Sequence, residues 1–276
     1  AAAVLRGRAD ERGGEVSGWR LRPLGPGRAG LAGGFLAERQ RVNRDHTLPH
    51  GFAQLRRSGT LENLRMAAGA GGRYRAAADT SGATFPFLDS DVYKWLEAVG
   101  WELGRAADPD LAAAADQAIA VVAAAQRPDG YLNSYVQVVR GGAPHADLAW
   151  GHEFYCIGHL IQAAVAWHRA LGDDRLLAIA VRAADRIDRE FGPAGREGVD
   201  GHPGIEMALV ELSRVTGEER YLTLAARNFI AHEFRRHERR QPPHDLPPHR
   251  SSDRGRQSPD DRGGWGIGNI GPVPEG

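Results

Sequence analysis

The sequence predicts an all-α fold built from repeated αα-hairpins. Apolar residues recur at helical spacing in six segments between residues 89 and 235, with glycine or proline at most of the breaks. Residues 169–177 also correspond to residues 214–222, so the pattern of helix, glycine turn and helix repeats at an offset of 45 residues. Such hairpins bury their apolar faces only by stacking on neighbouring hairpins.

The composition limits the possible partners. With 276 residues, 42% of them apolar, the chain can form one large domain or two small ones with a sizeable core. Its 35 basic and 35 acidic residues balance, so neither nucleic acid nor an anionic membrane is expected as a partner. No run of roughly 20 apolar residues predicts a membrane span, and no signal peptide is visible. A cytoplasmic location is the resulting expectation.

Residues 1–84 are rich in glycine and arginine and show weak periodicity. They predict an irregular N-terminal arm that packs on the helical domain, with one short helix near Thr60–Ala68. Residues 237–276 are dense in proline, arginine, serine and glycine, a composition that predicts disorder because it buries too little apolar surface. Our hypothesis is that this tail is encoded out of frame. Because position 1 is alanine, we also expect a trimmed or partial chain.

The main domain is predicted at residues 85–236. Asp89 or Ser90 is expected to cap its first helix, because short polar side chains accept hydrogen bonds from the free amides of a helix start. Pro109 suits the first turn of the second helix. Residues 131–139 alternate and contain β-favouring residues, which predicts a short strand or extended loop. The later helices are expected at residues 152–171, 174–191, 203–216 and 218–235.

Two arrangements of the stacked hairpins remain open. They can form an open solenoid or close into a toroid. Long connections at residues 128–150 and 192–201 favour the toroid, in which functional loops gather on one face.

Five motifs support a family resemblance. They are Glu38-Arg39-Gln40-Arg41-Val42-Asn43 with Thr47-Leu48-Pro49-His50, Asp89-Ser90-Asp91-Val92-Tyr93-Lys94-Trp95-Leu96-Glu97-Ala98, Asp129-Gly130-Tyr131-Leu132-Asn133-Ser134-Tyr135, His152-Glu153-Phe154-Tyr155-Cys156-Ile157-Gly158-His159-Leu160, and Gly201-His202-Pro203-Gly204-Ile205-Glu206-Met207-Ala208-Leu209-Val210. In this order they resemble the β-L-arabinofuranosidase family of glycoside hydrolases, family 127. Several separate motifs are far more specific than one.

The resemblance implies an (α/α)6 barrel followed by β-sandwich domains, and retaining hydrolysis of terminal arabinofuranosides in glycans or glycoconjugates. It also implies a zinc-bound cysteine thiolate as nucleophile, with glutamates as a zinc ligand and a general acid/base. Zinc is a chemically sound choice, since a metal-bound thiol is deprotonated at neutral pH. All of this machinery lies later in family members than this chain reaches.

The chain departs from the family at that point. Cys156 is its only cysteine, so the later cysteine cluster is absent, and we expect no zinc to bind this chain. Six predicted helices amount to about half of an (α/α)6 barrel. We therefore predict an incomplete, inactive portion of the enzyme with no catalytic residue of its own. The unfinished barrel edge is expected to favour self-association.

His152 and His202 are the predicted substrate-binding residues. The resemblance places both among the sugar contacts, and a neutral imidazole can donate one hydrogen bond to a hydroxyl and accept another. The alternative is structural: His152 can cap a helix, and Gly201-His202-Pro203 can turn the chain into one. His159 lies two helical turns beyond His152 and is interpreted as a core histidine.

Other polar and aromatic candidates are given structural interpretations. Glu153 and Glu206 are explained by favourable interaction with a helix N-terminus. A metal site of His152, Glu153 and His202 is rejected, because adjacent helical residues point about 100° apart. Three aromatic residues can either stack on a furanose ring or serve as packing anchors. They are Tyr131, Tyr135 and Trp150.

A helical-repeat scaffold that binds protein without catalysis is the alternative function. In it, equivalent apolar residues of successive hairpins stack, and the loops contact the partner. The residues expected to stack are Val165, Leu177, Val210 and Leu222.

Overall fold

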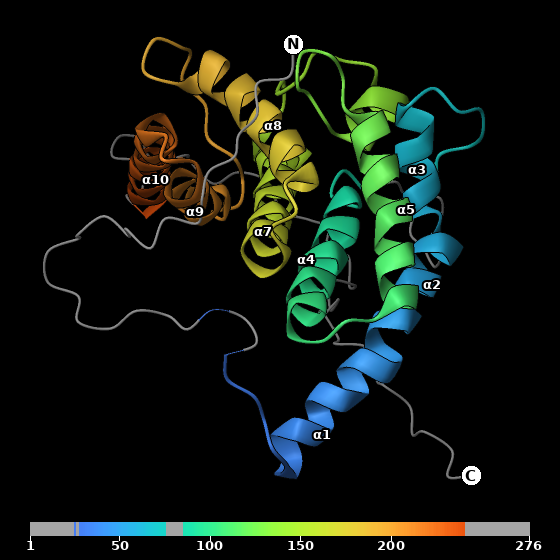
Figure 1. The fold of residues 1–276 in the computed structure, drawn as a ribbon. Coiled ribbons are helices and arrows are strands. Elements are labelled where there is room, and N and C mark those ends of the chain that lie inside the picture. The colour runs from blue at the N-terminus through green and yellow to red at the C-terminus, as the bar shows by residue number, and fades with distance from the viewer. Residues whose placement is uncertain (1–24, 26–27, 76–84, 241–276) are drawn as a thin grey trace, which may run out of the picture.

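The computed structural model describes residue 25, residues 28–75 and residues 85–240, with side chains up to residue 230. This part of the chain is helical and contains no strand (Figure 1), so the all-α prediction is confirmed. The helices are α1 Gly34–Val42, α2 Leu48–Ser58, α3 Thr60–Ala67, α4 Asp89–Arg105, α5 Pro109–Ala125, α6 Leu148–Gly151, α7 Glu153–Leu171, α8 Arg175–Phe191, α9 Ile205–Thr216 and α10 Glu219–Arg240, with π-helical turns at Asn43–Thr47 and Val136–Arg140. None of the described helices has the length and apolar content to cross a membrane.

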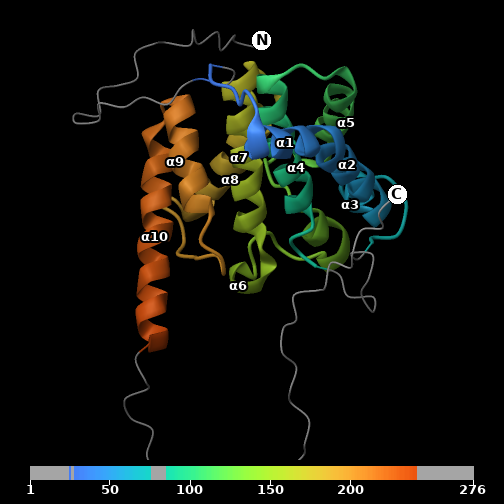
Figure 2. The same ribbon diagram turned by 90° about the horizontal axis from the view of Figure 1, so that it is seen from below.

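Helix α7 is the centre of the array. It packs against α4 on one side and against α8 and α9 on others, and α10 lies at the outer edge beside α9 (Figures 1 and 2). The α4–α7 contact is close because Gly100 faces Trp167: a Cβ at position 100 would lie 2.6 Å from the indole. The Trp167 Nε1–H donates to the Leu96 carbonyl at 2.7 Å. This hydrogen bond fixes the register of the two helices.

The repeat at an offset of 45 residues is also visible in the structure. Gly172 ends α7 and Gly217 ends α9, and both have positive φ (66° and 77°), the conformation that glycine adopts without steric cost. Leu176 of α8 and Tyr221 of α10 are equivalent and fully buried. Leu222 was predicted to stack, and this prediction is wrong, because its side chain is 50% exposed. The helix phase places the preceding residue in the core.

The prediction of an irregular N-terminal arm at residues 1–84 is wrong for the part of it that the structure describes as helical. The short helix at Thr60–Ala67 is confirmed, but residues 34–58 are helical as well. Each of these helices is short, and α2 buries only Leu48 and Leu55. Periodicity is therefore weak although the segment is ordered, and α2 and α3 pack on α4 and α5. The three-part domain division remains a prediction. The tail predicted to be disordered begins at residue 237, but residues 237–240 belong to helix α10, and residues 241–276 lie outside the described residues.

The prediction of a short strand or extended loop at residues 131–139 is wrong for most of this segment. Residues 131–133 belong to neither a helix nor a strand, but the chain then enters a helical turn that continues to Arg140. The side chain of Asn133 accepts a hydrogen bond from the Val136 amide at 2.9 Å, and its carbonyl accepts from the Gln137 amide at 3.0 Å. This local capping outweighs the β-propensity of the valines.

Candidate functional site

Two histidines from successive hairpins meet at the mouths of α7 and α9. His152 is the N-cap residue of α7, and His202 lies in the loop before α9. Their Nε2 atoms are 2.7 Å apart, and their ring centroids are separated by 4.5 Å. His152 is half-buried and His202 is exposed, so the pair lies at the protein surface. The structure therefore brings together the two residues predicted to bind substrate.

The hydrogen bonds of His152 assign its neutral tautomer. Its Nδ1 lies 2.7 Å from the carbonyl oxygen of Trp150, which can only accept, so Nδ1 carries the proton. The Nε2 atom of His152 is then an acceptor, and His202 Nε2–H donates to it. A ligand hydroxyl that replaces this mutual contact can donate to one ring and accept from the other.

Aromatic rings surround the histidine pair. The ring of Phe87 lies 5.2 Å from that of His152, and the ring of Tyr155 lies 5.9 Å from His152 and 5.6 Å from His202. Lys94 of α4 donates to the Tyr155 hydroxyl at 2.8 Å. The pair thus combines hydrogen-bonding imidazoles with apolar ring surface, the usual composition of a carbohydrate or small-molecule site.

Asp200 fixes the loop that carries His202. Its carboxylate is buried and accepts the Tyr155 amide at 2.7 Å and the Gly201 amide at 2.8 Å. Tyr155 belongs to the first turn of α7, where amides lack intrahelical acceptors, so Asp200 caps this helix from a distant loop. Burial raises the pKa of Asp200 to about 7.

The buried carboxyl of Asp200 is expected to make stability depend on pH. Its pKa is about 7 in the folded protein against 3.8 ordinarily, so the folded state binds the proton more tightly. The resulting stability is fully present below pH 3.8 and is lost as the pH rises through about 7. Between pH 5 and pH 8 the unfolding free energy should fall by about 2 to 3 kcal/mol through this group. Urea titrations of wild type and Asp200→Asn should show a weaker dependence in the variant, and equal slopes would contradict the assignment.

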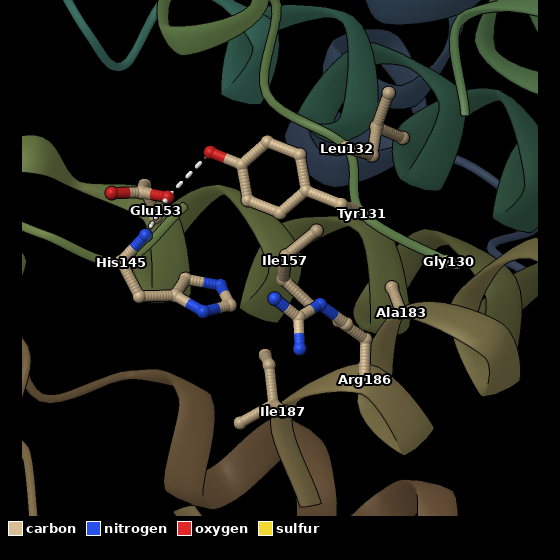
Figure 3. Close-up of a pocket in the computed structure, with 9 residues that line it drawn as sticks. All are labelled: Gly130, Tyr131, Leu132, His145, Glu153, Ile157, Ala183, Arg186 and Ile187. Carbon is tan, nitrogen blue, oxygen red and sulfur yellow. Dashed lines mark hydrogen bonds between the residues drawn. The ribbon is translucent and has the colours of Figure 1, made fainter. Parts of the chain in front are cut away.

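Glu153 points into a different, buried region (Figure 3). Its carboxylate accepts the Tyr131 hydroxyl at 2.5 Å and the His145 amide at 2.8 Å. The adjoining cavity measures about 10 Å³, room for about one water molecule and too small for a sugar. Interaction with the helix N-terminus is therefore an incomplete account of Glu153, which also anchors the loop before α7. Tyr131 is a buried packing anchor, not a stacking surface.

The prediction that Asp89 or Ser90 caps helix α4 is wrong. No side chain caps that helix, and Asp89 instead accepts both the amide and the hydroxyl of Ser134. The carboxylate therefore caps the helical turn that begins at Ser134, 45 residues later in the chain. Burial raises the pKa of Asp89 to about 6.

The remaining candidates differ in exposure. His159 was interpreted as a core residue, but it is half-buried, with its ring 4.6 Å from that of Tyr155, and burial lowers its pKa to about 4. Tyr135 lies edge-on to Tyr74, whereas Trp150 is 75% exposed. Glu206 accepts the Gly204 amide at 2.7 Å, in agreement with its predicted place at a helix start.

The described residues do not fit a zinc–thiolate centre. Cys156 is buried, and its thiol donates to the Pro86 carbonyl at 3.8 Å. Burial raises the pKa of this thiol well above its ordinary value, the opposite of what a nucleophile requires. Among residues 28–75 and 85–230, whose side chains the structure describes, no three His, Cys, Asp or Glu side chains are grouped to hold a metal.

Sequence reasoning did not identify Asp200, Lys94, Tyr155 or Phe87 as parts of this site. A signal existed for Asp200, which directly precedes the Gly201-His202 motif. The others lie inside helical or loop patterns that have ordinary packing explanations. Their role depends on which segments meet in space.

Comparison with known proteins shows consistent similarities. Residues 30–257 match the family described as beta-L-arabinofuranosidase, GH127 catalytic domain. A non-reducing end beta-L-arabinofuranosidase of Bifidobacterium longum subsp. longum is 41% identical over 175 residues, which cover 61% of this chain and 26% of that protein.

Two solved structures are also similar. A GH127 beta-L-arabinofuranosidase from Geobacillus stearothermophilus T6 has a TM-score of 0.67 and 39% identity, covering 72% of this chain and 32% of that one. The GH127 beta-arabinofuranosidase BT3674 has a TM-score of 0.63 and 34% identity, covering 70% and 31%. The chain thus spans a quarter to a third of the length of these relatives, and the predicted partial (α/α) barrel is confirmed.

Proposed function

Because the chain belongs to the family of GH127 beta-L-arabinofuranosidase catalytic domains, we propose that it binds a terminal β-L-arabinofuranosyl residue whose glycosidic bond the complete protein hydrolyses. The contact between His152 and His202 carries this proposal. Two imidazoles held at adjacent helix mouths can hydrogen-bond neighbouring hydroxyls of one sugar ring.

The proposed contribution of this chain is binding and not bond cleavage. The family resemblance implies a mechanism in which a zinc-held cysteine thiolate attacks the anomeric carbon and the anomeric configuration is retained. Cys156 does not suit that task, since it is buried and its pKa is raised. We therefore assign His152 and His202 as hydroxyl ligands and assign no catalytic residue among the described ones.

Replacement of His152 by alanine is expected to weaken binding of methyl β-L-arabinofuranoside by about tenfold. One lost hydrogen bond with an unsatisfied partner costs about 1 to 3 kcal/mol. Titration calorimetry on the purified chain measures this, with His202→Ala as the second test. The exposed His50, in α2, provides the matched control His50→Ala. Unchanged affinity in His152→Ala and His202→Ala, or an equal loss in His50→Ala, would refute the assignment.

Exposed apolar side chains favour a second candidate, a scaffold that binds protein or associates with itself. Met207, Leu222, Phe229 and Ile230 of α9 and α10 are 50% to 64% exposed, and α10 lies at the edge of the array (Figure 1). Exposed apolar surface of this kind often marks a protein interface. A chain that binds no arabinofuranoside in the titration would favour this candidate.

A further inference from the structure

His145 and His152 are the only residues other than glycine with positive φ in the described part of the chain, 57° and 53°. Such residues rarely adopt this conformation, and it persists where the surrounding contacts enforce it. The two histidines stand on either side of the short helix α6. His145 therefore has the same strained backbone as the site residue His152, although it lies outside the candidate site.

The side chain of His145 is enclosed. The residue is 3% exposed, and its imidazole Nδ1–H donates to the Glu190 carboxylate at 2.9 Å. Three aromatic rings lie edge-on to the imidazole, each with its centroid 5.4 Å away, and they belong to Tyr131, Phe154 and Phe191. Because a turn of the backbone would move the ring out of these contacts, they hold His145 in the left-handed conformation.

The backbone of His145 joins the two segments that carry the site histidines. Its amide donates to the Glu153 carboxylate at 2.8 Å (Figure 3), and Glu153 directly follows His152 at the start of α7. Its carbonyl accepts from the Arg196 guanidinium at 3.0 Å, and Arg196 lies in the loop that carries His202. Both hydrogen bonds depend on the φ and ψ of this one residue.

Glu190, near the end of α8, closes the junction. The carboxylate that accepts from the His145 ring also accepts from Arg196 Nε at 3.0 Å and lies 3.1 Å from the Arg186 guanidinium. The Arg196 amide donates to the Glu190 carbonyl at 2.8 Å. Arg196 is thus bonded both to the carbonyl of His145 and to the partner of its ring.

We propose that His145 is a positioning residue for the pair of His152 and His202. Its left-handed backbone directs the amide to the start of α7 and the carbonyl to the next loop, so that the two site rings meet. His145 acts through these segments and does not touch the ligand. This inference rests on the proposed function, which makes the histidine pair the ligand site.

Two variants of His145 test this role by titration calorimetry. Asparagine tolerates positive φ and retains a donor for Glu190, whereas leucine, of similar shape, has neither property. His145→Asn should bind methyl β-L-arabinofuranoside within about twofold of the unchanged chain, and His145→Leu about three- to tenfold more weakly.

Arg196→Met tests the same junction from its exposed end. The Arg196 side chain is exposed and lies over the Phe191 ring, with the guanidinium 4.3 Å from its centroid. Methionine retains this packing but removes the hydrogen bond to His145, so affinity should again fall about three- to tenfold. The matched control is Arg189→Met. Arg189 is also exposed and donates to a backbone carbonyl, that of Asp129 at 2.8 Å, and its loss should leave affinity unchanged.

NMR spectra of the histidine rings at about pH 8, where ordinary imidazoles are neutral, report on the pair without any ligand. In the unchanged chain and in His145→Asn, His152 should carry its proton on Nδ1, and its ring protons should show an Overhauser effect to those of His202. His145→Leu and Arg196→Met should lose this effect and show both tautomers of His152. A residue that only stabilises the fold would not change these signals in the folded variants.

Unchanged ring signals and affinity in His145→Leu and Arg196→Met would overturn the positioning role, as would an equal loss in Arg189→Met. If His145→Leu does not fold, Arg196→Met decides the question alone. An unchanged chain that binds no arabinofuranoside, but whose ring signals respond to the variants as expected, would overturn the proposed function and leave the positioning role of His145 intact.

Discussion

Leu176→Ala is expected to lower the unfolding free energy by about 2 to 5 kcal/mol, the usual cost of truncating a buried leucine. Leu176 is fully buried in α8, in the core that α7, α8 and α9 share. Removal of its isobutyl group leaves a cavity that stacked helices cannot easily close. Urea denaturation followed by circular dichroism measures the change.

Leu222→Ala is the matched control for this substitution. Leu222 has the same side chain but is 50% exposed, so its truncation should change stability by less than about 0.5 kcal/mol. Similar losses in the two variants would contradict the observed helix phase. A near-neutral Leu176→Ala would argue against the hairpin stack itself.

Gly130→Ala is expected to destabilise the protein by about 2 to 4 kcal/mol, through backbone strain together with overpacking. Gly130 has φ of 94°, and a Cβ there would overlap the backbone carbonyl of Arg182 in α8. Its own carbonyl accepts from the Gln126 amide group at 2.9 Å, which also donates to the Ile179 carbonyl. The turn cannot move away without breaking these contacts.

Gly141→Ala separates the two causes. Gly141 also has positive φ, 60°, but no atom lies within 4 Å of its added Cβ. Only the cost of the left-handed conformation remains, about 1 kcal/mol. Thermal and urea unfolding of both variants should therefore rank Gly130→Ala as clearly the less stable. The reverse order would show that contact with α8 is unimportant.

Only the two histidines of the candidate site could be predicted from the sequence. His152 and His202 stood out because each opens a helix within a recognisable motif, and helices of successive hairpins begin near one another. Their 2.7 Å contact could not be predicted, since it depends on the 192–204 loop returning to α7. Asp200 produces that return by capping a helix that begins 47 residues earlier in the chain. Capping rules based on neighbouring residues do not detect such a partner.

The sequence by itself determined the six helices predicted between residues 89 and 235, because apolar periodicity, Pro109 and the glycine ends at 172 and 217 are local properties of the chain. Tertiary structure decided what the buried carboxylates bind and which apolar residues are covered. Asp89 meets Ser134, Glu153 meets Tyr131, and Leu176 is buried where Leu222 is not. The physical reason is that desolvated carboxylates require donors wherever the fold supplies them, and burial depends on the neighbouring helix as well as on the residue.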